Sequence, residues 1–258
     1  MEHFIWSVNP IAFSFGSFHV FWYGILFAFA IIAGLQFMKW VYKIEGRDEE
    51  VLESMFLYIV IGIVVGARLG HVLFYDPSYY FAHPTKIIAV WEGGLASHGG
   101  GAGVILALFL FAKKERINYL WLLDRVAIPT ALFGFFVRMG NFMNSEILGV
   151  PTQKPWGIIF SRVDMLPRHP AQLYESFSYL FIFLLLTYLY KTKRNSFKNG
   201  FLFGLFLVLI FTVRLLVEFV KVKQADYDTS FLMMTAGQAL SIPFLIIGFA
   251  FIFWSFKK

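Results

Sequence analysis

The sequence predicts an all-α protein, a polytopic integral membrane bundle of about seven transmembrane helices. Of its 258 residues, 59% are hydrophobic and only 15% are charged, a composition far from that of soluble globular domains. Long apolar runs cover most of the chain, and each approaches the roughly 20 residues that a helix needs to cross a bilayer. A β-barrel would instead alternate polar and apolar residues in segments of about 10 residues. We therefore expect one membrane-embedded domain over residues 1–258.

Seven apolar runs are expected to form the spanning helices. They cover residues 20–40, 51–75, 95–112, 119–137, 171–190, 201–220 and 231–254. The segment before them, 1–19, is too polar to span and too aromatic for free solvation, so we expect an outer arm along the membrane interface. Two longer connections, about 76–94 and 141–170, are expected to be outer loops. Long ordered loops are usually functional.

The distribution of Lys and Arg predicts an outside N-terminus and an inside C-terminus. With this orientation, 12 of the 22 basic residues fall on the cytoplasmic side, 6 fall outside, and 4 lie within or at the rim of helices. Cytoplasmic loops carry the excess of positive charge in membrane proteins. The net charge of +6 therefore indicates topology and attraction to anionic lipid, and no nucleic-acid partner is expected.

The chain contains no cysteine. Disulfides, thiolate metal sites and a cysteine nucleophile are thereby excluded, and we expect neither a metal nor a cofactor. Any chemistry must use other side chains.

Arg138 opens a polar string at the end of an apolar run. The string continues through Asn141, Asn144 and Glu146 to Gly149. An unpaired arginine in hydrocarbon costs about 2.5 kcal/mol or more, so such residues usually face a bundle interior or a wet cavity and mark function. The structural alternative is a hydrogen-bonded plug that closes the outer end of the bundle.

His98 stands among six glycines, which lie between Gly93 and Gly103. Glycines permit close backbone approach to a ligand, and histidine titrates near neutrality. We favour a proton-transfer or ligand role over a hydrogen-bonded interior histidine. A hydrolase pair of Ser97 and His98 is disfavoured, because adjacent residues seldom orient as nucleophile and base.

Other polar residues in apolar runs each allow a functional and a structural interpretation. Arg214 and Glu218 are four residues apart, which predicts either a helix-locking pair or an arginine held by Glu218 to bind phosphate; we favour the second. Arg68 and His71 could equally contact a headgroup or hydrogen-bond a loop. Tyr23 lies where aromatic belts are common.

Near Arg68, small residues recur on one face of the second run. Gly62, Gly66 and Gly70 are four residues apart, which predicts close approach of a neighbouring helix.

These strings resemble the prolipoprotein diacylglyceryl transferase family. The string 138–149 resembles the family's signature, and further similar strings follow the family's order over essentially the whole chain: 22–24, 66–70, 92–100, 169–175 and 214–218. The resemblance implies seven helices with N-out, C-in topology in the bacterial cytoplasmic (inner) membrane.

The resemblance also implies an activity and its residues. The enzyme would transfer the diacylglyceryl group from phosphatidylglycerol to the lipobox cysteine of a preprolipoprotein, forming a thioether and releasing glycerol phosphate. The implied catalytic residues are His98 as the base and Arg138 and Arg214 as charge-stabilising groups. The implied substrate-binding residues are Tyr23, Arg68, Asn141, Asn144, Glu146, Gly149 and Glu218.

One position departs from the family pattern, and two other classes of function are alternatives to the transferase. Many members carry a Tyr where this chain has Ile210; either that hydroxyl is dispensable or another group such as Tyr174 replaces it. A transporter or lipid flippase would typically show repeated halves with broken helices, which the sequence lacks. A structural scaffold would leave the polar clusters without a purpose.

Overall fold

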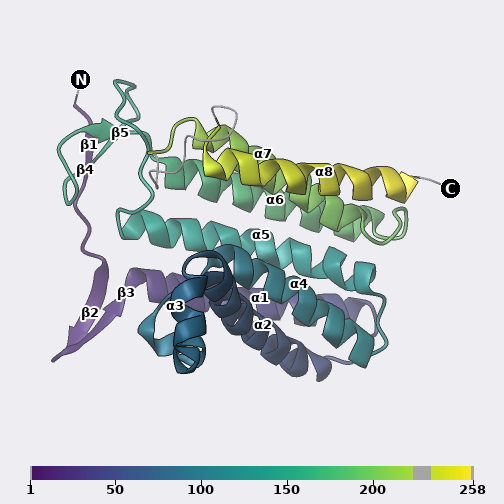
Figure 1. The fold of residues 1–258 in the computed structure, drawn as a ribbon. Coiled ribbons are helices and arrows are strands. Elements are labelled where there is room, and N and C mark those ends of the chain that lie inside the picture. The colour runs from purple at the N-terminus through teal and green to yellow at the C-terminus, as the bar shows by residue number, and fades with distance from the viewer. Residues whose placement is uncertain (1, 223–233, 257–258) are drawn as a thin grey trace. The chain divides into compact units, whose positions relative to one another are not determined.

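A computed structural model describes residues 2–222 and 234–256, apart from the side chains of Ser97 and Ala236. The described chain is mostly helical (Figure 1). The helices are α1 (Trp22–Ile44), α2 (Val51–Phe74), α3 (Pro77–Ala82), α4 (Ser97–Lys114), α5 (Tyr119–Met143), α6 (Ala171–Lys193), α7 (Phe201–Glu218) and α8 (Ala236–Phe256). Two 3-10 helices, η1 (Pro84–Ile88) and η2 (Val90–Glu92), follow α3.

Six helices in the described part of the chain are long and apolar enough to cross a membrane. They are α1, α2, α5, α6, α7 and α8. The chain is therefore a polytopic helical membrane protein, as its composition predicts. The seventh predicted run, 95–112, is also helical, as α4, but it is not among these six.

Helix ends differ from the predicted runs where polar residues begin. Helix α5 continues to Met143 rather than ending at Val137, so Arg138 and Asn141 are helical residues. Hydropathy marks the end of apolar sequence, whereas the helix continues wherever its side chains find partners. The start of the last predicted run, 231–233, lies outside the described residues.

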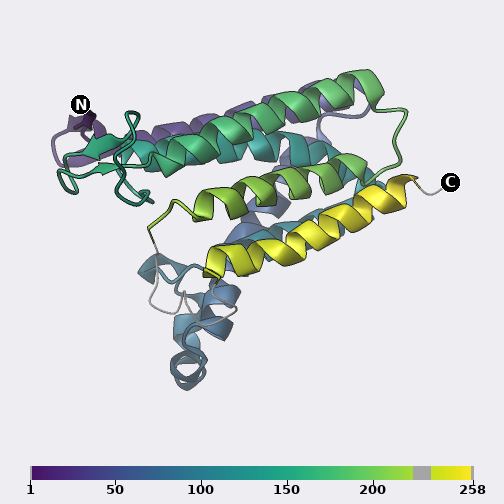
Figure 2. The ribbon, with the colours of Figure 1, turned by 90° about the horizontal axis from the view of Figure 1, so that it is seen from above.

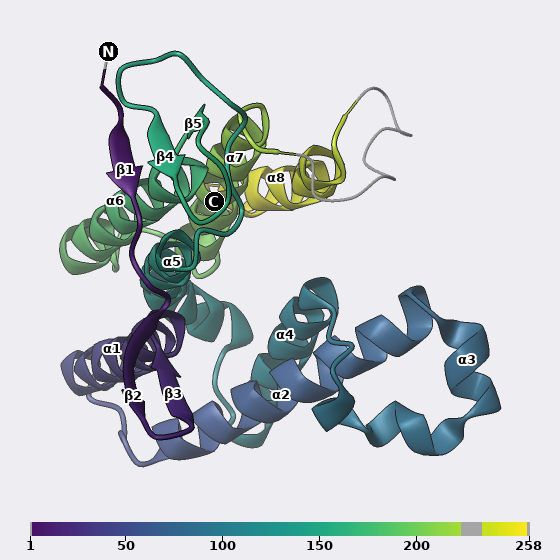
Figure 3. The same ribbon diagram turned by 90° about the vertical axis from the view of Figure 1, so that its left-hand side faces the viewer.

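The helical prediction is confirmed for the long apolar runs, but it did not include short strands in the segments outside them. Five short strands occur among the described residues: β1 (Phe4–Trp6), β2 (Ile11–Phe15), β3 (Phe18–Phe21), β4 (Ile158–Phe160) and β5 (Pro167–Arg168). Strands β2 and β3 form a hairpin within the predicted outer arm, and β4 lies between β1 and β5 (Figure 3). Strands of two to five residues are too short for a period-2 pattern to reveal them.

The chain divides into two compact units. The first consists of Met1–Met38 and Asp124–Lys258, and the second of Lys39–Leu123. In the first unit, α7 packs beside α8 and also contacts α6 (Figure 2). Its small sheet is fixed to the end of α5 by a buried cluster of Phe142, Ile158 and Phe160.

A buried carboxylate caps α7 within the first unit. Asp124 of α5 accepts hydrogen bonds from the backbone N–H groups of Gly200 and Phe203, each at 2.8 Å. The first N–H groups of a helix lack intrahelical partners, and a carboxylate satisfies them and complements the helix dipole. The tertiary contact thus supplies a cap that the local sequence of α7 lacks.

In the second unit, α2 packs on α4 through glycines. A Cβ built on Gly62 would lie 2.6 Å from the Gly103 carbonyl oxygen, and one on Gly70 would lie 2.8 Å from the Gly99 Cα. The predicted close approach of a helix to the glycine ridge of α2 is confirmed, and the neighbour is α4 with glycines of its own.

Candidate functional site

The candidate site begins at the end of α5, where two side chains lie one turn apart. Arg138 Nη1 donates to Asn141 Oδ1 at 3.2 Å, and Asn141 is buried. Residues three apart share a helix face, so the α5 backbone itself brings the pair together. The same turn presents Gly140, where an added Cβ would lie 2.7 Å from the ring of Tyr23. Tyr23 of α1 therefore packs against this turn.

The chain leaves α5 through a turn with unusual backbone angles. Ser145 and Ile147 have φ values of 57° and 55°, in the left-handed region that a β-branched residue such as Ile rarely adopts. Between them, Glu146 accepts hydrogen bonds from Asn141 Nδ2 at 3.3 Å and from Asn144 Nδ2 at 3.1 Å. Strained backbone of this kind persists where the surroundings hold it and clusters at functional sites.

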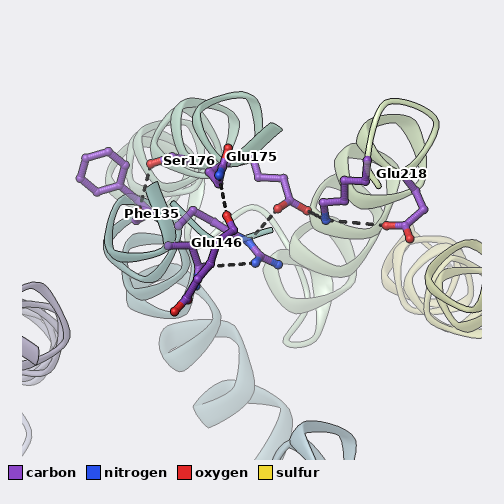
Figure 4. A network of polar contacts seen from close by, with 9 residues as sticks. Phe135, Glu146, Glu175, Ser176 and Glu218 are labelled. Atoms are coloured by element: carbon purple, nitrogen blue, oxygen red, sulfur yellow. Dashed lines mark hydrogen bonds and ion pairs between the residues drawn. The ribbon is translucent and has the colours of Figure 1, made fainter. Parts of the chain in front are cut away.

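Helix α6 supports the turn and contributes a buried carboxylate. Gln172 Nε2 donates to the Glu146 backbone carbonyl at 2.5 Å, and Ser176 Oγ donates to the Phe135 carbonyl of α5 at 3.0 Å. Glu175, which is fully buried, lies between two cations (Figure 4). Its Oε2 is 2.7 Å from Arg138 Nε, and its Oε1 accepts from Lys221 Nζ at 2.8 Å.

Glu218, at the end of α7, lies at the far side of Lys221. Its Oε2 is 3.7 Å from Lys221 Nζ (Figure 4), and its Oε1 accepts from Thr235 Oγ1 at 3.2 Å. The interpretation of Glu218 as the residue that holds Arg214 is wrong. The four-residue spacing puts Arg214 and Glu218 on one face of α7. The Glu218 carboxylate nevertheless contacts Lys221, one turn later, and Thr235, in the segment before α8.

Arg214 differs from the other basic residues of this cluster. Its Nε is buried without a hydrogen-bond partner among the described residues. The positive charges of Arg214 and Arg138 both act on the hydroxyl group of Tyr179, a buried residue of α6. A buried N–H without an acceptor is costly, so a ligand that supplies an oxygen there would be favoured.

Gly149 joins three segments through its backbone. Its N–H donates to the His169 carbonyl at 3.1 Å, and its carbonyl accepts from Arg168 Nη1 at 3.2 Å. A Cβ on Gly149 would lie 2.9 Å from the Val220 carbonyl oxygen and closer still to His169. Close backbone packing therefore accounts for glycine at this predicted site position.

Two predicted site residues, Arg68 and His98, belong to the second unit. The Arg68 guanidinium donates to four backbone carbonyls of the segment between α3 and α4: Lys86, Ile87 at 2.8 Å, Gly93 at 2.5 Å and Gly94 at 3.2 Å. This arrangement matches the loop-ordering alternative for Arg68. His98 is the second residue of α4, and its side chain is exposed.

Sequence reasoning did not select Glu175, Lys221 or Gln172. Glu175 ends the string that begins at His169, and a carboxylate inside an apolar helix was itself a signal, since such groups are expensive in a membrane. Lys221 gave no local signal, because a lysine just past a helix end is ordinary. Within residues 2–222 and 234–256, no group of three or more His, Asp or Glu is placed to hold a metal.

The cluster in the first unit can bind an anion and stabilise developing negative charge. Arg138 is a planar donor held at Nε and Nη1, and Arg214 offers an unsatisfied N–H. Guanidinium groups match phosphate geometry, and oriented donors in a site that excludes water stabilise transition-state charge strongly.

Comparison with known proteins gives matches along nearly the whole chain. The family model described as prolipoprotein diacylglyceryl transferase matches residues 10–254. A protein of Tolumonas auensis named phosphatidylglycerol–prolipoprotein diacylglyceryl transferase is 51% identical over 254 residues, which cover 98% of each chain. Proteins of the same name from Chloroherpeton thalassium and Bacteroides fragilis are 44% and 43% identical. These matches cover 100% and 98% of this chain, and 96% and 95% of the relatives.

Proposed function

The chain belongs to the prolipoprotein diacylglyceryl transferase family, and from that membership we infer that it transfers a diacylglyceryl group from phosphatidylglycerol to a prolipoprotein. It is a transferase that catalyses the first step of lipoprotein lipidation. The acceptor is the thiol of the lipobox cysteine, and the products are a thioether and glycerol phosphate. A chain without cysteine suits this reaction, because the substrate supplies the sulfur.

The observation that carries this proposal is the pair of arginines in the first unit. In the reaction, the thiolate sulfur attacks the glycerol carbon that bears the phosphate, the carbon–oxygen bond breaks, and its electron pair leaves with glycerol phosphate. Negative charge therefore moves from sulfur to the phosphate oxygen. Arg138, fixed by Glu175 and Asn141, and Arg214, with its unsatisfied Nε, are the donors that would stabilise this charge.

The thiol must lose its proton before or during the attack. Only the thiolate is an effective nucleophile, and a free cysteine is mostly protonated at neutral pH. We assign the base to His98 on the family resemblance, and its exposed position at the start of α4 leaves the ring accessible.

The remaining predicted residues have two kinds of role. Tyr23, Asn141, Asn144 and Glu146 lie together in the first unit and would contact the lipid headgroup or hold the groups that do. Gly149 and Glu218 would fix the segments around Lys221, and Arg68 would order the outer segment of the second unit.

We further propose that the chain forms one membrane domain with seven spans, α4 being the seventh. The excess of basic residues supports an outside N-terminus and a cytoplasmic C-terminus, and the bacterial relatives support a location in the inner membrane. In this orientation the first residues of α6 and the last of α5 lie toward the outer face.

A transfer assay with purified protein tests the function. Phosphatidylglycerol labelled in its acyl chains is incubated in detergent with a lipobox peptide and with the matched Cys→Ser peptide. The proposal predicts label on the cysteine peptide alone. Folded protein that leaves both peptides unlabelled would contradict it and favour a lipid-binding protein without chemistry.

A further inference from the structure

Glu175 is a buried acid that the proposed chemistry does not require as a reactant. Its side chain is 0% exposed, and it lies between Arg138 of α5 and Lys221 after α7 (Figure 4). A carboxylate this deep must be paired to remain charged. The two contacts supply that pairing.

The two cations depend on Glu175 to different degrees. Lys221 has a second carboxylate, Glu218, at 3.7 Å. Arg138, by contrast, has one ion pair within residues 2–222 and 234–256, that between its Nε and Glu175 Oε2 at 2.7 Å. Loss of Glu175 would therefore leave Lys221 with a counter-ion and Arg138 without one.

The contact also fixes the direction of the Arg138 side chain. Glu175 engages Nε, Asn141 engages Nη1, and the Tyr179 hydroxyl is within reach of the same guanidinium. A guanidinium has five N–H groups, so at least two remain to donate to a phosphate. Glu175 Oε2 accepts no hydrogen bond from Nε, so the orientation of the guanidinium depends on this ion pair together with the hydrogen bond from Nη1 to Asn141. A guanidinium kept in one orientation meets the condition for preorganised stabilisation of charge.

We propose that Glu175 is a positioning residue that holds Arg138 in the orientation needed for the transfer reaction, an inference that rests on the proposed function. Glu175 touches neither the lipid nor the thiol. Its effect on turnover passes through Arg138, and its pairing with Lys221 serves stability.

The test compares three variants with the parent protein: Glu175→Gln, Lys221→Met, and the double variant. Glutamine keeps the shape of the Glu175 side chain and removes its negative charge. In Glu175→Gln, Lys221 loses one of its two carboxylate partners, so Lys221→Met removes the positive charge that is then less well neutralised. Misplaced catalytic groups cost rates of about 10- to 100-fold, so kcat should fall by this factor in Glu175→Gln while KM for the peptide stays unchanged. The double variant should remain at least about tenfold below Lys221→Met.

The double variant separates positioning from simple charge balance. If Glu175 only neutralises Lys221, removing both charges should restore kcat to the level of Lys221→Met, and the proposal would be overturned. Where Glu175→Gln alone folds poorly, the comparison between Lys221→Met and the double variant still decides. An active parent protein establishes the transferase independently of this result.

Ser176→Ala is the matched control for a general disturbance of α6. Ser176 is buried, follows Glu175 directly, and binds the Phe135 carbonyl of α5. Its substitution should lower the melting temperature and leave kcat unchanged. A loss of kcat in Ser176→Ala as large as that in Glu175→Gln would show that α5–α6 packing, and not the carboxylate, sets the rate.

Discussion

Arg138 is held at two of its nitrogens, and this makes its shape as important as its charge. Arg138→Lys keeps the charge but loses the planar fork and the Nε contact to Glu175. Loss of one oriented donor to a developing oxyanion typically costs about 100-fold in kcat, and we expect a loss of this size. Transfer kinetics with labelled phosphatidylglycerol measure it.

Arg162→Lys is the control for that substitution, since Arg162 is an exposed residue outside the helices. It should leave kcat unchanged. Near-normal turnover of Arg138→Lys would show that a point charge suffices and that the fork has no part in the reaction.

Asp164 offers a pH-dependent contact outside the spanning helices. The hydrogen-bonded Arg168 guanidinium holds the pKa of the Asp164 carboxyl below its usual range. The stability gained is present above the ordinary carboxyl pKa and is lost as the pH falls through the lowered one. We expect Asp164→Asn to melt slightly below the parent at neutral pH, since exposed pairs contribute about 1 kcal/mol or less.

The pH dependence of that difference is the check. The two melting temperatures should converge as the pH falls below the ordinary carboxyl range. A difference that stays constant with pH would mean that the charge of Asp164 contributes nothing.

At the residue scale, the sequence identified one side of the site and not the other. Arg138, Asn141, Asn144 and Glu146 fall in one polar string, and the structure joins all four by hydrogen bonds. The counter-ion of Arg138, Glu175, comes from α6, and the second cation that Glu175 contacts, Lys221, lies three residues after the end of α7. A sequence read locally shows which group is charged but not which remote group pairs with it.

At the element scale, the packing of α2 on α4 depends on the absence of side chains. Gly62→Ala would place its Cβ 2.6 Å from the Gly103 carbonyl and 2.7 Å from the Ala107 Cβ. The helices must then separate, and overpacking of this kind costs about 1–3 kcal/mol. We expect a lower melting temperature in detergent.

Gly101→Ala on α4 is the matched control, because a Cβ there meets nothing within 4 Å. Alanine favours the helix over glycine by about 1 kcal/mol, so this variant should melt at the parent temperature or above it. Equal destabilisation by the two substitutions would contradict a close-packed glycine interface.

The sequence predicted the long, strongly hydrophobic elements and missed the short ones. All seven apolar runs contain helices, because long apolar sequence leaves few other folds in lipid. The five strands were missed for different reasons. Strand β1 pairs with β4 across most of the chain, neither has more than three residues, and their pairing follows from tertiary packing on the end of α5. Strands β2 and β3 form a local hairpin, which an analysis of hydropathy alone does not reveal.

At the scale of the whole molecule, orientation in the membrane can be tested with introduced cysteines. The chain has none, so each new thiol reports alone. Val163→Cys lies in the loop after β4, and Ser196→Cys lies between α6 and α7. With the N-terminus outside, a membrane-impermeant thiol reagent should label Val163→Cys in intact spheroplasts and Ser196→Cys only after permeabilisation. The reverse pattern would invert the proposed topology.

The reaction balance tests the central claim most directly. Purified protein, phosphatidylglycerol and lipobox peptide are incubated, and the lipidated peptide and free glycerol phosphate are quantified together by mass spectrometry. Transfer to the thiol predicts equal amounts of the two products, with the peptide mass raised by one diacylglyceryl group. Glycerol phosphate released without lipidated peptide, or lipid bound with neither product formed, would contradict the account.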